Sequence, residues 1–328
     1  MIVDPAHQKY QDFFYDNFEW AVTENALKWR MMEWTRVLRG HNMFWDFDSH
    51  SPSWLSTLSR DQLLDAMHVR VNGTIAHTKG KLVHWDVNNE NLHGDYFERR
   101  LHNPNITSSM FKWIHQLEPG VKLFLNDYNI VNSNTYTTAY KMQAKILKAS
   151  NVPVYGIGVQ SHFKSSNIDY DAVKYRLDKV AEAGLPIWIT EMSILDTDNQ
   201  KKADALEKLL TLYFSHPAVE GVLFWGFWDG KVFDRRIALA NGPDVVVNKP
   251  PNAAGIRYQT LFKQTWRTNI TRPLHHGVHI SGYHGHYSLD VKHNGKVIES
   301  QVFTLGRHGK LVTVNLHGSG ESTKCNFR

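Results

Sequence analysis

The hydrophobic pattern between residues 81 and 229 repeats a short apolar run followed by a longer amphipathic stretch. The apolar, β-branched or aromatic runs are Lys81–Val87, Val121–Leu125, Val154–Val159, Pro186–Thr190 and Val219–Phe227. Helical spacing of apolar residues occurs between them, in Thr107–Leu117, Thr135–Ala149, Asp171–Ala183 and Asn199–Phe214. Strand and helix alternating with a period of roughly 32–39 residues predict repeated βα units and a parallel sheet.

The polar residues that follow each run decide between an open sheet and a barrel, since both fit the alternation. No glycine-rich phosphate loop follows any run, which disfavours a nucleotide-binding open sheet. The runs end instead in the clusters Asn88-Asn89-Glu90, Asn126-Asp127-Tyr128, Gln160-Ser161-His162, Thr190-Glu191 and Trp228-Asp229. Barrel enzymes carry their chemistry on this carboxyl-terminal rim. We therefore predict an α/β fold of the (β/α)8 TIM-barrel type.

The pattern changes after about residue 267, where helical periodicity disappears. The short runs His286–Lys292, Lys296–Thr304 and Lys310–Leu316 alternate apolar and polar residues and are separated by glycines. Such alternation is typical of antiparallel strands with one solvated face. We predict two domains, a barrel of residues 1–266 and a small C-terminal antiparallel β domain of residues 267–328.

Composition narrows the class of protein. The chain has 328 residues, 42% of them hydrophobic, which is ample for a large core. No apolar run approaches the roughly 18 residues of a membrane span, so we expect a soluble protein without a membrane partner. The single cysteine, Cys325, excludes an internal disulfide and a thiol zinc cluster. The net charge of +5 comes from scattered basic residues, which disfavours nucleic-acid binding.

Histidines are numerous, but none has the spacing of a known metal motif. The group at positions 275, 276, 279, 284 and 286 is the one candidate, and we interpret it as exposed strand and loop residues. No metal ion or other cofactor is therefore expected.

Two glutamates are the candidates for chemistry. Glu90 and Glu191 each follow an apolar run, so both should point into the barrel mouth. A lone glutamate at a strand end is usually a solvated rim residue. A pair flanked by other polar residues fits acetal hydrolysis, which needs one acid to protonate the leaving oxygen and a second carboxylate as nucleophile or base.

The segments around these residues resemble motifs of the family ten glycoside hydrolases, the endo-β-1,4-xylanases. Trp85-Asp-Val-Asn-Asn-Glu90 is similar to their acid/base motif and Ile189-Thr-Glu191 to their nucleophile motif. Five further segments resemble family motifs, namely Thr23–Trp29, Arg39–Trp45, Leu123–Asn129, Gly158–His162 and Trp225-Gly226. Seven ordered motifs across residues 23–226 make a chance match implausible. The tail is similar to the C-terminal extension of plant and animal members.

The resemblance implies a retaining mechanism with Glu191 as nucleophile, Glu90 as acid/base and His162 holding the nucleophile. It implies sugar contacts from Glu24, Asn25, Lys28, His41, Trp45, Asn89, Tyr128, Gln160, Trp225 and Phe233. Gln160 and His162 are two apart on one expected strand and should face the same way. The expected partner is a β-1,4-xylan-type polysaccharide cleaved internally by a monomer. A β-1,4-glucanase with weak xylan activity and a catalytically impaired glycan-binding protein remain open alternatives.

Two site positions depart from the family pattern. Ser193 stands where the family usually has the aspartate that supports the catalytic histidine. Serine carries no charge, so His162 should be less readily protonated. Phe233 replaces the second tryptophan of the site's roof, which keeps the stacking surface but loses the indole N–H donor.

The N-terminal quarter departs further. The first barrel strand, expected upstream of residue 10, is not recognisable. Residues 29–36 are too few for the family's second helix, because a crossover between parallel strands needs roughly 10–12 residues. We expect an incomplete barrel, as in a shortened form of the protein, with a damaged non-reducing side. The resemblance also implies an extracellular protein. No signal peptide is visible in residues 1–20, although sequons at Asn72, Asn105 and Asn269 weakly suggest secretion.

Overall fold

The structure, a computed structural model, describes residues 8–22, 37–242, 251–273, 278–306, 308–315 and 322–327. It divides into two compact units, Met1–Tyr258 and Gln259–Arg328. The division lies within helix α8 (Ala253–Thr260), upstream of the boundary at 266/267 that the loss of helical periodicity suggested.

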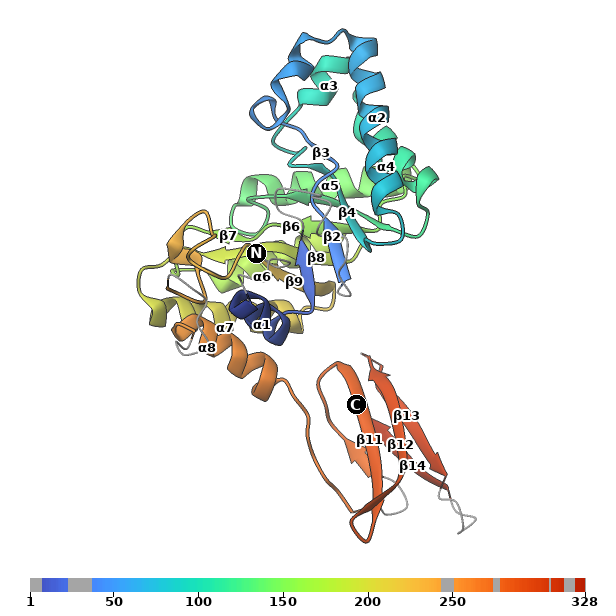
Figure 1. The fold of residues 1–328 in the computed structure, drawn as a ribbon, viewed down its shortest axis with the longest axis vertical. Helices are drawn as coiled ribbons and strands as arrows, with labels where there is room; N and C mark the ends of the chain where they lie inside the picture. Colours follow the sequence, from blue (N-terminus) through green and yellow to red (C-terminus); the bar gives the residue numbers. More distant parts are fainter. Residues whose placement is uncertain are drawn as a thin grey trace. The chain divides into compact units, whose positions relative to one another are not determined.

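The first unit is a nearly closed barrel of parallel strands with helices outside it (Figure 1). Its neighbouring strands are, in order, β1 (Trp20–Val22), β2 (Val37–Gly40), β4 (His84–Asn89), β5 (Lys122–Asp127), β6 (Gly156–Val159), β8 (Ile187–Ile194) and β9 (Val219–Phe224), and every pairing is parallel. Two short strands extend the rim, β3 (Phe44–Trp45) beside β4 and β7 (His162–Phe163) beside β8. The prediction of a (β/α)8-type barrel is confirmed.

Helices follow the strands around the outside. They are α1 (Gln8–Asn17), α2 (Arg60–Thr78), α3 (Tyr96–Leu101), α4 (Ile106–Leu117), α5 (Asn134–Ala149), α6 (Tyr170–Ala181), α7 (Asn199–Ser215) and α8, with short 3₁₀ helices at Asp48–His50, Ser53–Thr57 and Arg235–Ile237 and a π-helical turn at Leu261–Thr265. The predicted helix face of Val173, Leu177 and Val180 is buried in α6. Helix α2 was not predicted, although a capping box of Ser59 and Gln62 marks its start.

The barrel interior near the amino ends of the strands is filled by large apolar side chains. Phe124, Trp188 and Leu223 form a buried cluster, and Trp20 packs against it from β1. Gly221 lies directly opposite the ring of Trp188. A Cβ added at Gly221 would lie 2.5 Å from that ring, so glycine leaves the space that the ring needs. Since residues of β1 and β9 share this cluster, the sheet curves until its two end strands enclose one interior.

The expected gaps in the N-terminal quarter concern residues 1–7 and 23–36, which lie outside the described residues. In the part of the barrel that the structure describes, seven parallel strands follow one another from β1 to β9. Helix α1 packs through aromatic contacts on the segment that follows β9. Tyr10 and Phe13 stack on Phe227 at ring-centroid distances of 4.9 and 5.2 Å.

The second unit is a small β structure. Strands β11 (Gly285–His293) and β12 (Lys296–Leu305) form an antiparallel hairpin, and β13 (Lys310–Asn315) pairs antiparallel with β14 (Ser322–Phe327). Val291, Leu305, Val312 and Val314 form its buried core. The predicted antiparallel domain is confirmed, with one unexpected parallel pair between β10 (Val278–Ile280) and β14.

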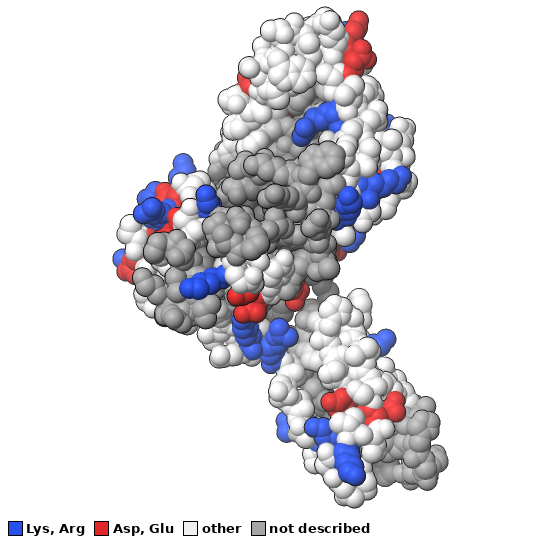
Figure 2. All heavy atoms as spheres, viewed as in Figure 1, with Lys and Arg blue, Asp and Glu red and all other residues white. Residues whose placement is uncertain are grey.

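Two kinds of feature are absent from the residues that the structure describes. No helix there is long and apolar enough to cross a membrane. No group of three or more His, Cys, Asp or Glu residues there is arranged to hold a metal ion, and positions 275 and 276 lie outside those ranges. On the face shown in Figure 2, side chains of both charges are interspersed.

Candidate active site

Both strands that lead to the candidate glutamates are irregular near their carboxyl ends. The register of β4 with β5 shifts between Asp86 and Asn89, and that of β8 with β9 shifts between Ile189 and Met192. A bulge of this kind changes the direction in which the following side chains point. Its effect is visible at β8, where two consecutive side chains, Thr190 and Glu191, both reach the side-chain amide of Asn126.

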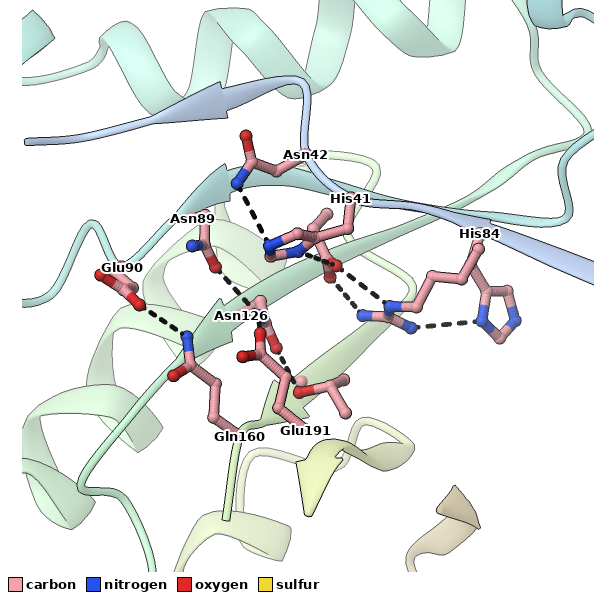
Figure 3. A network of polar contacts seen from close by, with 12 residues as sticks. His41, Asn42, His84, Asn89, Glu90, Asn126, Gln160 and Glu191 are labelled. Atoms are coloured by element: carbon pink, nitrogen blue, oxygen red, sulfur yellow. Dashed lines mark hydrogen bonds and ion pairs between the residues drawn. The ribbon is translucent and has the colours of Figure 1, made fainter. Parts of the chain in front are cut away.

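Glu90 follows β4 in a left-handed backbone conformation with φ of 59°. Its carboxylate accepts hydrogen bonds from Trp45 Nε1 at 2.8 Å and from Gln160 Nε2 at 2.9 Å, and the latter bond is drawn in Figure 3. Burial raises the pKa of Glu90, the two hydrogen bonds lower it, and the charges of Glu191 and Asp127 raise it, with a net increase. A carboxyl group that keeps its proton to higher pH is suited to act as an acid.

Glu191 lies on β8 with only 5% of its surface exposed. One carboxylate oxygen accepts a hydrogen bond from Asn126 Nδ2 at 2.8 Å, and the other lies 3.2 Å from His162 Nε2. The other ring nitrogen of His162 lies 2.7 Å from Ser193 Oγ, because β7 and β8 pair these two residues in register. Ser193 thus makes the contact with His162 that the family's aspartate is expected to make at this position.

Gln160 and His162 do not lie on one continuous strand as expected. Strand β6 ends at Val159, Ser161 is left-handed with φ of 65°, and β7 begins at His162. Because the strand is interrupted between β6 and β7, the two side chains contact different carboxylates. Gln160 contacts Glu90, whereas His162 contacts Glu191.

A buried charge network lies beside the nucleophile candidate (Figure 3). Asp86 forms an ion pair with Arg39 and lies 3.0 Å from His41 Nδ1. Burial tends to raise the pKa of Asp86, but the Arg39 charge and the bonds from both partners bring it below its usual value. Burial tends to lower the pKa of His41, but its bond to Asp86 and the charge of Glu191 bring it above its usual value. His41 is therefore protonated more readily than an ordinary histidine.

Aromatic rings form a wall of the site. Trp225 meets His41 and His162 edge-on at centroid distances of 5.4 and 6.4 Å, and Phe233 meets His162 edge-on at 6.2 Å. Phe233 is 63% exposed, so its face is open to a ligand. Trp45 stacks on His50 at 3.9 Å. Such rings offer apolar faces on which sugars can stack.

Asn89 and Tyr128 complete the predicted residues that the structure describes. Asn89 Oδ1 accepts from Asn126 Nδ2 at 2.9 Å, and its own buried Nδ2 meets no acceptor among the described residues, which leaves a donor for a ligand hydroxyl. Tyr128 stacks on His93 at 3.8 Å, and His93 Nδ1 lies 2.6 Å from Asp127. His93 was not predicted as a site residue, although it follows Glu90 by three positions.

The structure therefore brings most predicted side chains to one rim. Glu24, Asn25 and Lys28 lie outside the described residues. The sequence motifs contained Asn126 and Arg39, but only the contacts reveal that Asn126 bridges the two halves of the site and that Arg39 fixes the charge of Asp86.

A parallel (β/α) barrel with two carboxyl groups on its carboxyl-terminal rim, one bonded to a histidine and one desolvated, defines a glycosidase type of site. The sequence profile of Glycosyl hydrolase family 10 matches residues 7–246, and the chain belongs to this family.

Individual relatives agree with this assignment. The chain is 34% identical over 310 residues to Endo-1,4-beta-xylanase 2 of Arabidopsis thaliana, covering 87% of this chain and 28% of that protein. It is 33% identical over 321 residues to Anti-sigma-I factor RsgI6 of Acetivibrio thermocellus, covering 91% of this chain and 41% of that protein. The chain thus spans less than half the length of these two relatives.

Solved structures share the fold. Xylanase 10B of Thermotoga petrophila, crystallised with xylobiose, superposes with a TM-score of 0.68 at 23% identity, covering 79% of this chain and 89% of that one. Native xylanase 10B of Thermotoga maritima gives a TM-score of 0.67 at 23% identity, covering 79% and 90%. At this identity the likeness concerns the fold.

Proposed function

We propose that this chain hydrolyses β-1,4-xylan-type polysaccharides at internal bonds with retention of configuration. The observation that supports it most is the different surroundings of its two carboxyl groups. Glu191 is buried and bonds to an amide donor and His162, whereas Glu90 is partly exposed, accepts from Trp45 and Gln160 and has a raised pKa. Two carboxyl groups with contrasting environments are what a nucleophile and an acid require. The xylanase names of the relatives supply the substrate class.

In the proposed reaction a Glu191 oxygen bonds to the anomeric carbon as the bond to the leaving oxygen breaks, and Glu90 gives its proton to that oxygen. Water then attacks the anomeric carbon from the opposite face, Glu90 takes a proton from the water, and the bond to Glu191 breaks. Asn126 and His162 hold Glu191 in place throughout. A retaining mechanism requires a carboxyl separation of roughly 5–5.5 Å.

The test is product analysis on xylan and carboxymethylcellulose, combined with NMR of the first anomer released. We expect internal cleavage of xylan, initial release of the β-anomer, and slower release of reducing sugar from carboxymethylcellulose. Faster cleavage of carboxymethylcellulose would make the protein a β-1,4-glucanase. Initial release of the α-anomer would contradict retention.

A glycan-binding role without turnover is the second candidate. It is favoured by Ser193, which gives His162 a neutral partner, and by Phe233, which lacks an indole donor. A relative named as an anti-sigma factor is also 33% identical to this chain over 321 residues. Calorimetry with xylohexaose decides between the two candidates. The protein concentration is set high enough for an active enzyme to hydrolyse all the xylohexaose. Binding heat with no new products over a day would establish the second candidate.

We further propose that the protein acts outside the cell, where such polysaccharides occur. The side chains of Asn72, Asn105 and Asn269 are exposed, so each sequon could carry a glycan. Mass spectrometry of the protein from its natural source, before and after enzymatic deglycosylation, should show a mass loss. An unmodified intracellular protein would contradict this proposal.

A further inference from the structure

A buried lysine lies behind the wall of the site. Lys202 is on α7 and is 2% exposed. Its ammonium group donates hydrogen bonds to the carbonyl oxygens of Arg236 at 2.8 Å and Ala238 at 2.9 Å. No carboxylate forms an ion pair with it in the part of the chain that the structure describes. Burying an ammonium group is costly unless its hydrogen bonds are supplied, so these carbonyl contacts should determine where the segment lies.

The two carbonyls belong to the loop that presents Phe233. The loop leaves the barrel at Trp228, which bridges to Ala240, so its two ends are joined. The outgoing half ends at Phe233, beside His162. The returning half is the 3₁₀ helix Arg235–Ile237, and Lys202 holds the end of this helix.

We propose that Lys202 is a positioning residue for substrate binding, which acts by holding the returning half of this loop so that Phe233 stays beside His162. The inference rests on the proposed function, because it assigns Phe233 to sugar contact. Lys202 touches neither carboxyl group, so it should affect binding far more than bond cleavage.

The charge of Lys202 gives the proposal a pH signature. Burial lowers the pKa of Lys202 to about 8, with the charge of Asp196 opposing this effect. Among the charged residues of the loop, Arg236 pairs with Asp234 at the start of the 3₁₀ helix. Loss of the proton above that pH removes the charge from the two hydrogen bonds, and charge-assisted bonds are about twice as strong as neutral ones. The loop should therefore be held less firmly at alkaline pH.

The experiment compares Lys202→Met with Lys148→Met. Lys148 is a matched control, since its ammonium group also donates to a carbonyl oxygen, that of Gly184 at 2.8 Å, away from the site. With xylohexaose we expect KM to rise about 5–30-fold in Lys202→Met, kcat to stay within about threefold, and Lys148→Met to match wild type. Wild-type KM should rise as pH passes about 8, and this rise should be absent in Lys202→Met.

Hydrogen exchange supplies a measurement that does not need activity. Peptides covering residues 229–240 should exchange their amide hydrogens faster in Lys202→Met than in wild type. In Lys148→Met their exchange rate should equal that of wild type. If wild type neither binds nor cleaves xylohexaose, the proposed function fails and the exchange result still decides whether Lys202 holds the loop. If Lys202→Met does not fold, Phe233→Ala should abolish the alkaline rise in KM. An unchanged KM with unchanged exchange, or a full alkaline rise in Phe233→Ala, would overturn the proposal.

Discussion

The barrel interior has two layers of opposite character. Near the amino ends of the strands, the ring of Trp20 packs against that of Trp188, and Phe124 completes their buried cluster around His84. Two residues farther along β5, Asn126 bonds Asn89 and Glu191 in a polar layer where most side chains have a hydrogen-bond partner. The same parallel strands supply both layers. The apolar layer stabilises the barrel, whereas the polar layer holds charges ready for a ligand at some cost to stability.

The largest effect should follow removal of the nucleophile from the polar layer. Glu191→Ala should reduce turnover of every glycoside below detection, because no other carboxylate described at the site contacts His162. The unfolding temperature should stay close to that of wild type. Initial rates on xylan and on an aryl xylobioside, with thermal unfolding of the same samples, check this. Residual turnover of either substrate above a few per cent would assign the nucleophile elsewhere.

Removal of the acid should give a smaller loss that depends on the leaving group. Glu90→Ala should lose about 10²–10⁴-fold in kcat on xylan, the usual contribution of a general acid. A dinitrophenyl xylobioside should be cleaved at nearly the wild-type rate of glycosyl-enzyme formation, because its leaving group needs no proton. Burst kinetics measure that step. Equal losses on both substrates would remove Glu90 from the acid role.

A substitution in the apolar layer should change stability and leave chemistry alone. Trp188→Ala should lower the free energy of unfolding by about 3–5 kcal/mol, as for other buried large-to-small changes. The control Trp54→Ala, at a site 57% exposed, should change it by less than about 0.5 kcal/mol. Denaturant titration gives both values. If the folded molecules of Trp188→Ala no longer turn over substrate, the apolar layer also serves the chemistry and the two layers are not distinct in role.

The pH profile should respond to the hydrogen bonds of Glu90. Trp45 Nε1 donates to the ionised carboxylate and lowers its pKa. Trp45→Phe removes the donor, so the pKa of Glu90 rises. Because the acid must be protonated, the alkaline limb of kcat/KM then moves to higher pH. Trp54→Phe should leave the profile unchanged. A limb that stays in place or moves to lower pH in Trp45→Phe would show that Glu90 does not set it.

The smallest effect should come from the serine that contacts His162. Ser193→Ala removes one neutral hydrogen bond of 2.7 Å, worth about 0.5–1.5 kcal/mol. We expect kcat to fall about two- to tenfold while KM for xylohexaose changes little. A loss above about a hundredfold would mean that Ser193 takes a direct part in the chemistry.

The apolar layer was more predictable than the polar one. The strand and helix periods place β5, β6 and β9 and helices α4 to α7 close to where the structure has them, because their packing follows simple alternation. Helix α2 is not among the predicted helices, although its buried residues recur every four positions, at Leu63, Met67, Val71 and Ile75. The second unit also agrees with its alternating pattern, apart from the parallel pairing of β10.

The polar layer escaped prediction where the backbone is irregular. A period of two places Thr190 and Glu191 on opposite faces of β8, yet both contact Asn126 because the strand is bulged. The left-handed residue Ser161 likewise sends Gln160 and His162 to different carboxylates. Bulges and single left-handed residues depend on the tertiary surroundings, so a periodic pattern does not reveal them. Family motifs supplied the residue identities that periodicity could not.

The left-handed backbone at Glu90 bears on how such a protein could evolve. For most residues that conformation costs roughly 1–2 kcal/mol, whereas glycine and asparagine adopt it readily. A mutation of Glu90 to either residue would thus remove the acid while relieving backbone strain. Selection for stability alone would favour that exchange. Descendants that keep the other site residues and bind polysaccharide without cutting it therefore lie one substitution away.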